Sequence, residues 1–425
     1  MQLFSVFKKE FVKNVLTLIT GSALSQIILY IAIPVLTRLF SEELFGIYML
    51  FSSITILLKP LLSLKYELAI ILPKREKDAI NLFVFTLLIL LALSGLLYLI
   101  IFFFDDEILH FFNVERLAVF IYWIPLSVFF VGIISAFDYW NNRNNAFKNI
   151  SKGLITKSAT TSTSQIATGF SSFSSLGLIP GMIFGQFCQL LMLIGVSLKS
   201  ISQNTKYVSL KRMIFLAKKY KDIPVFNTLI NFTNTLSNEL PILLISRYFG
   251  LANVGVYGLA IKVGRAPVGI IQQSVSQVFY NKASKTYNLK EDLNQIVKKT
   301  YQSLLKIGFL VFTPLFIISF YLDFIFGENW IDVGLYVRIL IPWLFVAFLS
   351  APLTSLTLVL NKQKAMLFYD TFLLIFRFLA MFIGYYFYND IVISLILFSG
   401  IGAIFNFFML LYLLKISKNK NTVYQ

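Results

Sequence analysis

Apolar residues fill twelve long stretches of this chain, and short polar or basic segments separate them. A helix needs about 20 mostly apolar residues to cross the hydrocarbon core of a bilayer, and each stretch is long enough. We therefore expect an all-α, polytopic membrane protein. The expected spans cover residues 14–39, 44–70, 79–104, 117–138, 152–172, 176–198, 224–247, 252–280, 302–326, 333–360, 365–388 and 391–415.

Two of these spans carry small or hydroxyl side chains in unusual number. The span at 152–172 is rich in Ser and Thr, whose hydroxyls can bond back to the carbonyls of their own helix inside a membrane. We keep it as a span because the basic segment 199–221 would otherwise change sides. The next span has Gly177, Gly181 and Gly185 four residues apart, which predicts a close-packing helix face.

The charge pattern sets the expected topology. Of the 425 residues 57% are hydrophobic and 13% are charged, the mean hydropathy is +0.77, and the net charge is +17. Lysine and arginine concentrate in alternate loops, such as 199–221 and 282–299, whereas the opposite loops are mainly acidic. This distribution follows membrane topology rather than nucleic-acid binding, and it predicts that both termini are cytoplasmic.

Several kinds of chemistry lack the residues that they need. The chain has one histidine, His110, and one cysteine, Cys188, so neither a zinc hydrolase site nor a Cys–His nucleophile is expected. It also has no GxxxxGK[ST] motif for nucleotide phosphates. We expect a protein that is not an enzyme and that holds no metal or cofactor.

An internal repeat divides the chain. Arg38, Phe40, Gly46 and Tyr48 recur as Arg247, Phe249, Gly255 and Tyr257 at a constant offset of 209 residues, and Ile124-Pro125 recurs as Ile341-Pro342. Six expected spans separate the copies, so the copies have the same orientation, as in transporters built from two parallel bundles. The predicted domains are a six-helix bundle at 1–200, a basic cytoplasmic linker at 201–221, a second six-helix bundle at 222–417 and a cytoplasmic tail at 418–425.

Charged residues lie inside the expected spans, and most are basic. A buried charge is costly in lipid, so such residues usually face a cavity or a partner. Near span ends they can instead reach the interface, which we expect of Lys157, Lys306, Arg338 and Asp323. The basic set is Arg38, Lys59, Lys65, Lys157, Arg247, Lys262, Arg265, Lys306, Arg338 and Arg377, and the acidic set is Glu67, Glu239, Asp323 and Asp370.

The excess of cations near span centres predicts a substrate with negative charge. Thr55, Lys59, Ser63 and Glu67 form a stripe at four-residue spacing, although Lys65 and Glu67 could simply pair with each other. Pro60 and Pro241 are expected to interrupt helices beside these charges.

A second polar face follows the span at 224–247. Asn227, Asn231, Asn234 and Asn238 lie along one side of a helix, where they could line a cavity or join neighbouring helices.

Several blocks of sequence resemble the Wzx-type oligosaccharide flippases, in the polysaccharide transporter branch of the MATE-like flippase superfamily. The blocks are GSALSQ near Gly21, KYELAIILPKREKDAINL from Lys65, IPVFNTLIN from Ile223, SVSQVFY from Ser274 and FGENW from Phe326. The resemblance implies two six-helix bundles arranged as a V in the bacterial cytoplasmic (inner) membrane. It further implies alternating access that moves an undecaprenyl-diphosphate-linked sugar repeat unit to the outer leaflet, for O-antigen, lipopolysaccharide or capsule synthesis.

The resemblance and the charge pattern together give a candidate site. We expect Lys59, Lys262 and Arg265 to hold the diphosphate or acidic sugars, and the amides to bond sugar hydroxyls. The candidate substrate-binding residues are Arg38, Lys59, Lys65, Asn231, Asn234, Asn238, Lys262, Arg265, Gln273 and Arg377. The candidate coupling residues are Glu67, Glu239 and Asp370. They would couple transport to H⁺ or Na⁺, or the membrane potential would supply the energy instead.

Candidate partners besides the lipid-linked oligosaccharide are membrane lipids, a polysaccharide polymerase and a chain-length regulator. One alternative is a cation-coupled multidrug exporter of the same superfamily, which should have an acidic cavity. Another is a membrane polymerase or glycosyltransferase, which usually carries a large outer loop that this chain lacks. The sequence leaves open the repeat unit, the coupling ion and the oligomeric state.

Overall fold

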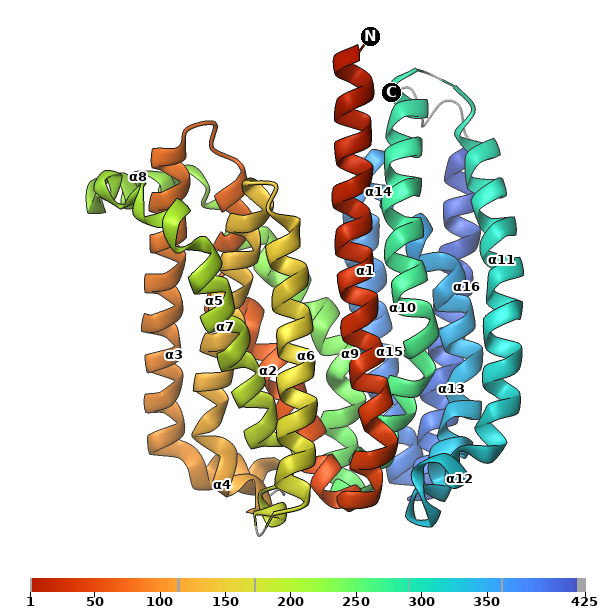
Figure 1. The fold of residues 1–425 in the computed structure, drawn as a ribbon. Helices are drawn as coiled ribbons and strands as arrows, with labels where there is room; N and C mark the ends of the chain where they lie inside the picture. Colours follow the sequence, from red (N-terminus) through yellow and green to blue (C-terminus); the bar gives the residue numbers. More distant parts are fainter. Residues whose placement is uncertain (1, 113–114, 172, 290, 361, 419–425) are drawn as a thin grey trace. The chain divides into compact units, whose positions relative to one another are not determined.

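The computed structural model describes residues 2–112, 115–171, 173–289, 291–360 and 362–418. Within these ranges the chain is mostly helical and has no β-strand, which confirms the predicted all-α class (Figure 1). The chain forms two compact units, Met1–Val254 and Gly255–Gln425. The expected division fell in the basic linker at 201–221, whereas the boundary between the compact units comes one helix later, because α9 packs on α2 in the first unit.

The described part of the first unit contains seven long helices and several short ones. The long helices are α1 (Gln2–Leu39), α2 (Glu42–Ser63), α3 (Glu76–Phe112), α5 (Trp123–Arg143), α6 (Phe147–Gly169), α7 (Ile179–Ser202) and α9 (Thr228–Tyr248). The short ones include α4 (Ala118–Ile121), α8 (Leu210–Lys219) and the 3₁₀ helix η1 (Tyr66–Ile71).

The second unit begins inside a long helix. Helix α10 (Leu251–Asn288) starts in the first unit and continues into the second. The remaining α-helices of the described residues are α11 (Leu293–Ile318), α12 (Leu322–Phe326), α13 (Ile331–Ser350), α14 (Ser355–Val359), α15 (Gln363–Tyr388) and α16 (Ile391–Lys418). Helix α16 packs against both α13 and α15, and α13 also packs against α11.

Among the described residues, nine helical stretches are long and apolar enough to cross a membrane. The other three long helices are α6, α9 and α10, and each of them coincides with an expected span. Helix α6 satisfies its hydroxyls locally: Thr160 Oγ1 donates to the Thr156 carbonyl at 2.7 Å and Thr168 Oγ1 to the Ser164 carbonyl at 2.6 Å. Polar side chains that bond within their own helix lower the cost of a span.

Four expected spans are divided in the structure. The span predicted at 302–326 is divided between α11 and α12, and the span predicted at 333–360 is divided between α13 and α14. The span predicted at 44–70 ends as an α-helix at Ser63, because Leu64 and Lys65 have positive φ angles of 47° and 55°. A right-handed α-helix cannot continue through two residues in the left-handed conformation, so η1 starts in a new direction. The span predicted at 117–138 is divided between α4 and α5, and α5 runs on to Arg143.

The prediction that two prolines interrupt their helices is wrong. Pro60 lies inside α2 and Pro241 inside α9, and both helices continue beyond the proline. A proline removes one backbone hydrogen bond, and neighbouring groups in a helical bundle can compensate for that loss.

The repeated sequence motif occupies equivalent positions in the two halves of the chain. Arg38 lies in the last turn of α1, just before the tight connection to α2, and Arg247 lies in the last turn of α9, just before the connection to α10. Gly46 packs on the backbone of Leu251 at the start of α10, where any side chain would overlap the Leu251 carbonyl. The repeat therefore marks a structurally equivalent helix–helix turn.

Glycines on α7 allow it to approach α6 closely. A Cβ at Gly181 would lie 2.9 Å from the Gln165 backbone nitrogen, and one at Gly185 would lie 3.0 Å from the Lys157 carbonyl oxygen. The predicted packing face is therefore confirmed at these two positions. Gly177 is the exception: it precedes α7 in a turn with φ of +67°, so it contributes conformation rather than helix packing.

Candidate functional site

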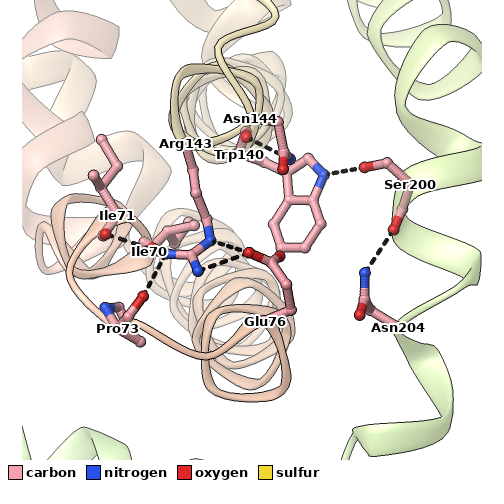
Figure 2. A network of polar contacts seen from close by, with 9 residues as sticks. All are labelled: Ile70, Ile71, Pro73, Glu76, Trp140, Arg143, Asn144, Ser200 and Asn204. Carbon is pink, nitrogen blue, oxygen red and sulfur yellow. Dashed lines mark hydrogen bonds and ion pairs between the residues drawn. The ribbon is translucent and has the colours of Figure 1, made fainter. Parts of the chain in front are cut away.

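The segment that follows α2 is held in place by Arg143 of α5. The Arg143 guanidinium donates to the carbonyls of Pro73 at 2.6 Å, Ile71 at 3.1 Å and Ile70 at 3.4 Å. It also reaches the Glu76 carboxylate, at 2.8 Å from Nη2 and 3.2 Å from Nε (Figure 2). Five donors in a rigid fork suit arginine to this role, because the connection exposes carbonyls that no helix satisfies.

The same segment brings Lys65 and Glu67 together beside the end of α2. The Lys65 ammonium lies 3.8 Å from Glu67 Oε1, so the pairing considered from the sequence occurs. Ser63 Oγ donates to Glu67 Oε1 at 3.3 Å and accepts the Lys65 backbone N–H at 3.2 Å. Glu67 is 1% exposed, and its Oε2 is buried with no hydrogen-bond donor from the described residues.

The polar stripe of Thr55, Lys59, Ser63 and Glu67 therefore does not lie on a single helix. Thr55, Lys59 and Ser63 do share α2, but Glu67 lies on η1 and folds back onto Ser63. Thr55 continues the polar chain inward: its hydroxyl lies 3.5 Å from Ser127 Oγ, and Ser127 donates to Gln186 Oε1 at 3.1 Å. These contacts join α2, α5 and α7 through buried polar groups.

Five ionisable residues gather in the first unit, and we call them the amino-terminal charge cluster. Glu67, Lys65, Asp138 and Lys157 all act electrostatically on Lys59. Asp138 of α5 is acted on in turn by Lys59 and Lys157, and Lys157 of α6 by Asp138 and Tyr48. The cluster thus joins α2, η1, α5 and α6, and it contains three ammonium groups and two carboxylates.

Asp138 was missed by sequence reasoning. The expected span ends at this residue, and Asp138 is absent from the acidic residues expected inside the spans, whereas α5 continues to Arg143 and carries Asp138 inside the helix. Asp138 Oδ1 is buried and has no hydrogen-bond donor among the described residues. Lys157 was expected to reach the membrane interface, yet it lies half-buried in the cluster. A longer apolar window through SAFDYW would have placed Asp138 correctly.

A second cluster surrounds Trp343 in the other unit, and we call it the arginine–tryptophan cluster. The Arg377 guanidinium lies 4.5 Å from the Trp343 ring centre and 4.7 Å from the Phe398 ring centre. Arg265 approaches the same indole at 5.5 Å. Arg377 is 2% exposed, and Asp370, Tyr369 and Tyr257 act on it electrostatically. A cation on an aromatic face gains more stabilisation where water is excluded.

Gly402 makes room for this arrangement. A Cβ at Gly402 would lie 2.7 Å from the Trp343 ring and 3.1 Å from Arg377 Nη2. The neighbouring polar groups are ordered as well, since Ser350 Oγ donates to Asn406 Oδ1 at 2.9 Å and Asn406 Nδ2 donates to the Gly402 carbonyl at 2.7 Å. Helices α13, α15 and α16 therefore meet at a polar and aromatic centre.

The asparagines of α9 bond along their own helix. Asn231 Nδ2 donates to the Asn227 carbonyl at 2.7 Å, and Asn238 Nδ2 donates to the Asn234 carbonyl at 2.9 Å. Asn234 is exposed, and Asn231 and Asn238 are half-buried. Each amide keeps an oxygen that can accept a further hydrogen bond.

The remaining candidates differ in exposure. Lys262 and Glu239 are half-buried, and Arg265 is exposed apart from its approach to Trp343. Arg38 is exposed at the end of α1, and Gln272 Nε2 donates to the Ala347 carbonyl at 3.4 Å. The side chain of Gln273 lies outside the described residues. Within those residues, no group of three His, Cys, Asp or Glu side chains could hold a metal ion.

Comparison with known proteins gives a family and a fold. The family model described as "Polysaccharide biosynthesis protein" matches residues 35–334, which is more than half of the chain. No curated protein matches the sequence.

Solved structures match over almost the whole chain. The lipid II flippase MurJ in an inward closed conformation has a TM-score of 0.70 at 17% identity, over 96% of this chain and 91% of that one. The MATE multidrug transporter DinF-BH also has a TM-score of 0.70, at 16% identity and 97% coverage of both chains. A MATE transporter of Vibrio cholerae, VcmN, gives 0.63 at 13% identity and full coverage of both.

Proposed function

The chain belongs to this family of polysaccharide biosynthesis proteins, and from that premise we propose that it is a flippase for lipid-linked oligosaccharides. Its substrate is an undecaprenyl-diphosphate-linked repeat unit, which it moves from the inner to the outer leaflet of the bacterial cytoplasmic membrane by alternating access. The product serves O-antigen, lipopolysaccharide or capsule synthesis. Both termini are cytoplasmic in this proposal, as the distribution of basic loops favours.

The observation that carries the proposal is the excess of positive charge in the amino-terminal charge cluster. The three ammonium groups of Lys59, Lys65 and Lys157 outnumber the carboxylates of Glu67 and Asp138, and these side chains belong to helices of the membrane bundle. An uncompensated ammonium in a low-dielectric site is costly, so a bound anion would stabilise it. A diphosphate between a polyprenyl tail and a sugar supplies such an anion.

The proposal gives each group a role. Lys59 and Lys157 attract the diphosphate, and Asp138 balances their charge when no substrate is bound. Arg265 and Arg377, with Lys262 and Arg38, bind phosphate or acidic sugars, because a guanidinium can bond two oxygens at once. Asn231, Asn234, Asn238 and Gln273 bond sugar hydroxyls. Glu67, Glu239 or Asp370 binds the coupling H⁺ or Na⁺, or the membrane potential drives the step.

A direct test uses the purified protein in proteoliposomes that contain the lipid-linked oligosaccharide of the native pathway. Appearance of the sugar in the opposite leaflet, measured with an impermeant glycosidase or lectin, supports the function. We expect Lys59→Ala and Lys157→Ala to lose at least 90% of that signal. Each variant removes a charge-assisted contact, and its loss should weaken substrate binding about tenfold or more. Lys152→Ala is the matched control, because Lys152 is exposed on the same helix as Lys157.

A cationic-dye arm distinguishes the main alternative. Efflux of a lipophilic cation without any flipping of the lipid-linked sugar would identify a multidrug exporter instead. The excess of cations over carboxylates in both clusters disfavours that outcome, because like charges repel in a low-dielectric site. New glycosidic linkages formed in the same vesicles would indicate a polymerase or glycosyltransferase and would contradict the proposal.

A further inference from the structure

Helix α8 runs in a different direction from the long helices of the first unit. It follows α7 and lies across the end of α3 rather than along it (Figure 1). With the ten residues Leu210–Lys219 it is too short to cross a bilayer. Because α3 is a membrane span that starts at Glu76, a helix held at this end of α3 lies at the level of the lipid headgroups.

Specific contacts fix α8 in that position. Arg212 Nε lies 2.8 Å from Asp78 Oδ1, and Arg212 Nη2 lies 2.9 Å from Asp78 Oδ2, which is a two-pronged ion pair. These hydrogen bonds from Arg212 to Asp78 raise the pKa of the Arg212 guanidinium above its ordinary value. Asn81 accepts the Ser209 backbone N–H at 2.9 Å and donates to the Tyr207 carbonyl at 2.8 Å.

The apolar side of α8 is only partly covered by protein. Met213 and Leu216 are buried in the first unit, at 4% and 1% exposure. At 100° per residue, Leu210 and Ile214 continue the same apolar arc, yet they are 68% and 46% exposed. The first unit therefore covers only half of the apolar arc, and the other half is exposed and could contact lipid.

The rest of the helix surface is mainly basic, although Phe215 is 53% exposed there. Lys211, Lys218 and Lys219 are exposed, and the segment from Lys206 to Lys221 contains no acidic residue. Tyrosines flank the helix, with the Lys206 ammonium 5.2 Å from the Tyr207 ring centre and the Lys219 ammonium 5.3 Å from that of Tyr220. Tyrosine and lysine side chains with an apolar body and a polar tip are typical of the membrane–water interface.

We propose that α8 is a binding site for anionic phospholipids in the leaflet where the basic loops lie. Leu210 and Ile214 enter the acyl-chain region, while Lys211 and Lys218 bind lipid phosphates beside it. The commitment to a lipid surface rests on the exposed apolar arc next to the lysines, at the height where a span begins. No residue of this site belongs to the amino-terminal charge cluster or to the arginine–tryptophan cluster. The proposal therefore does not depend on what the protein transports.

The depth of α8 can be measured with a single environment-sensitive thiol probe. Cys188→Ser removes the one native thiol, and Ile214→Cys or Lys219→Cys then places the probe on the apolar or the basic arc. In nanodiscs that contain anionic phosphatidylglycerol and a doxyl-labelled lipid, we expect at least twofold stronger quenching at position 214 than at 219. Equal quenching at the two positions overturns the proposal.

The preference for anionic lipid needs its own variant. We expect Lys211→Gln with Lys218→Gln to reduce the number of phosphatidylglycerol molecules retained by the detergent-purified protein, at least twofold, as counted by native mass spectrometry. Lys298→Gln with Lys299→Gln is the control, since this pair is exposed on α11 and changes the charge equally. An equal reduction in both double variants, or none in either, overturns a specific site on α8.

Discussion

Arg143 and Glu76 form an ion pair of 2.8 Å across the turn that joins η1 to α3. The same guanidinium donates to three backbone carbonyls of that turn (Figure 2). Glu76 lies within KYELAIILPKREKDAINL, the longest block that resembles the oligosaccharide flippases. In this protein the block shapes a turn and positions Glu67, and its Arg143 partner comes from a different helix.

The Arg143 contacts should contribute measurably to stability. Arg143→Ala removes the donors of three carbonyls, and at about 1 kcal/mol for each hydrogen bond we expect a loss of about 2–4 kcal/mol. Glu76→Gln should cost less than about 1 kcal/mol, because half of the Glu76 side chain is exposed. Thermal unfolding in detergent measures both, with the exposed Arg75→Ala as control. Equal melting temperatures for Arg143→Ala and Arg75→Ala would show that the carbonyl contacts are not needed.

Asp138 should be required for transport, although the sequence did not indicate it. Asp138→Asn keeps the shape of the side chain but leaves Lys59 and Lys157 without their shared carboxylate. We expect at least a tenfold lower flipping rate at normal expression, with partial recovery in Asp138→Glu. Glu107→Gln is a suitable control, since Glu107 is exposed near the far end of α3. A normal rate in Asp138→Asn would remove this residue from the mechanism.

The close approach of α6 and α7 can be tested with two glycines of one helix. Gly185→Ala would place a methyl group against Thr161 and the Lys157 carbonyl, and overpacking of this kind typically costs about 1–3 kcal/mol. Gly195→Ala meets no atom within 4 Å, so it should be neutral or stabilising by up to about 1 kcal/mol. Gly185→Ala should therefore lower the melting temperature, and Gly195→Ala should leave it unchanged or raise it. The prediction fails if Gly185→Ala melts at or above the wild-type temperature.

A similar pair tests the arginine–tryptophan cluster. Gly402→Ala would press on Trp343 and Arg377, whereas Gly400→Ala on the same helix meets no atom within 4 Å. We expect at least a fivefold lower transport rate in Gly402→Ala and a change in tryptophan fluorescence, and neither in Gly400→Ala. A misplacement of about 1 Å in a binding group is sufficient for losses of this size. Unchanged transport in Gly402→Ala would mean that the cluster has a structural role.

Local properties of the sequence were enough to predict the helices and their order. The Ser- and Thr-rich α6 was expected to cross because alternate loops carry the basic residues, and it is a continuous helix in the structure. The repeat around Arg38 and Arg247 correctly marked two equivalent turns. Helix length, hydropathy and loop charge each depend on one stretch of chain, so they can be evaluated without knowledge of the packing.

Hydropathy and charge along the chain are therefore enough to predict an all-α membrane protein with polar residues inside its helices. Which of those polar residues lie close together depends on how the helices pack. Asp138 comes close enough to Lys59 and Lys157 to act on them electrostatically because α5 packs against both α2 and α6. Glu67 turns back onto Ser63 because Leu64 and Lys65 adopt left-handed conformations. Contacts between residues far apart in the chain depend on helix packing and backbone direction, which periodicity along one helix does not specify.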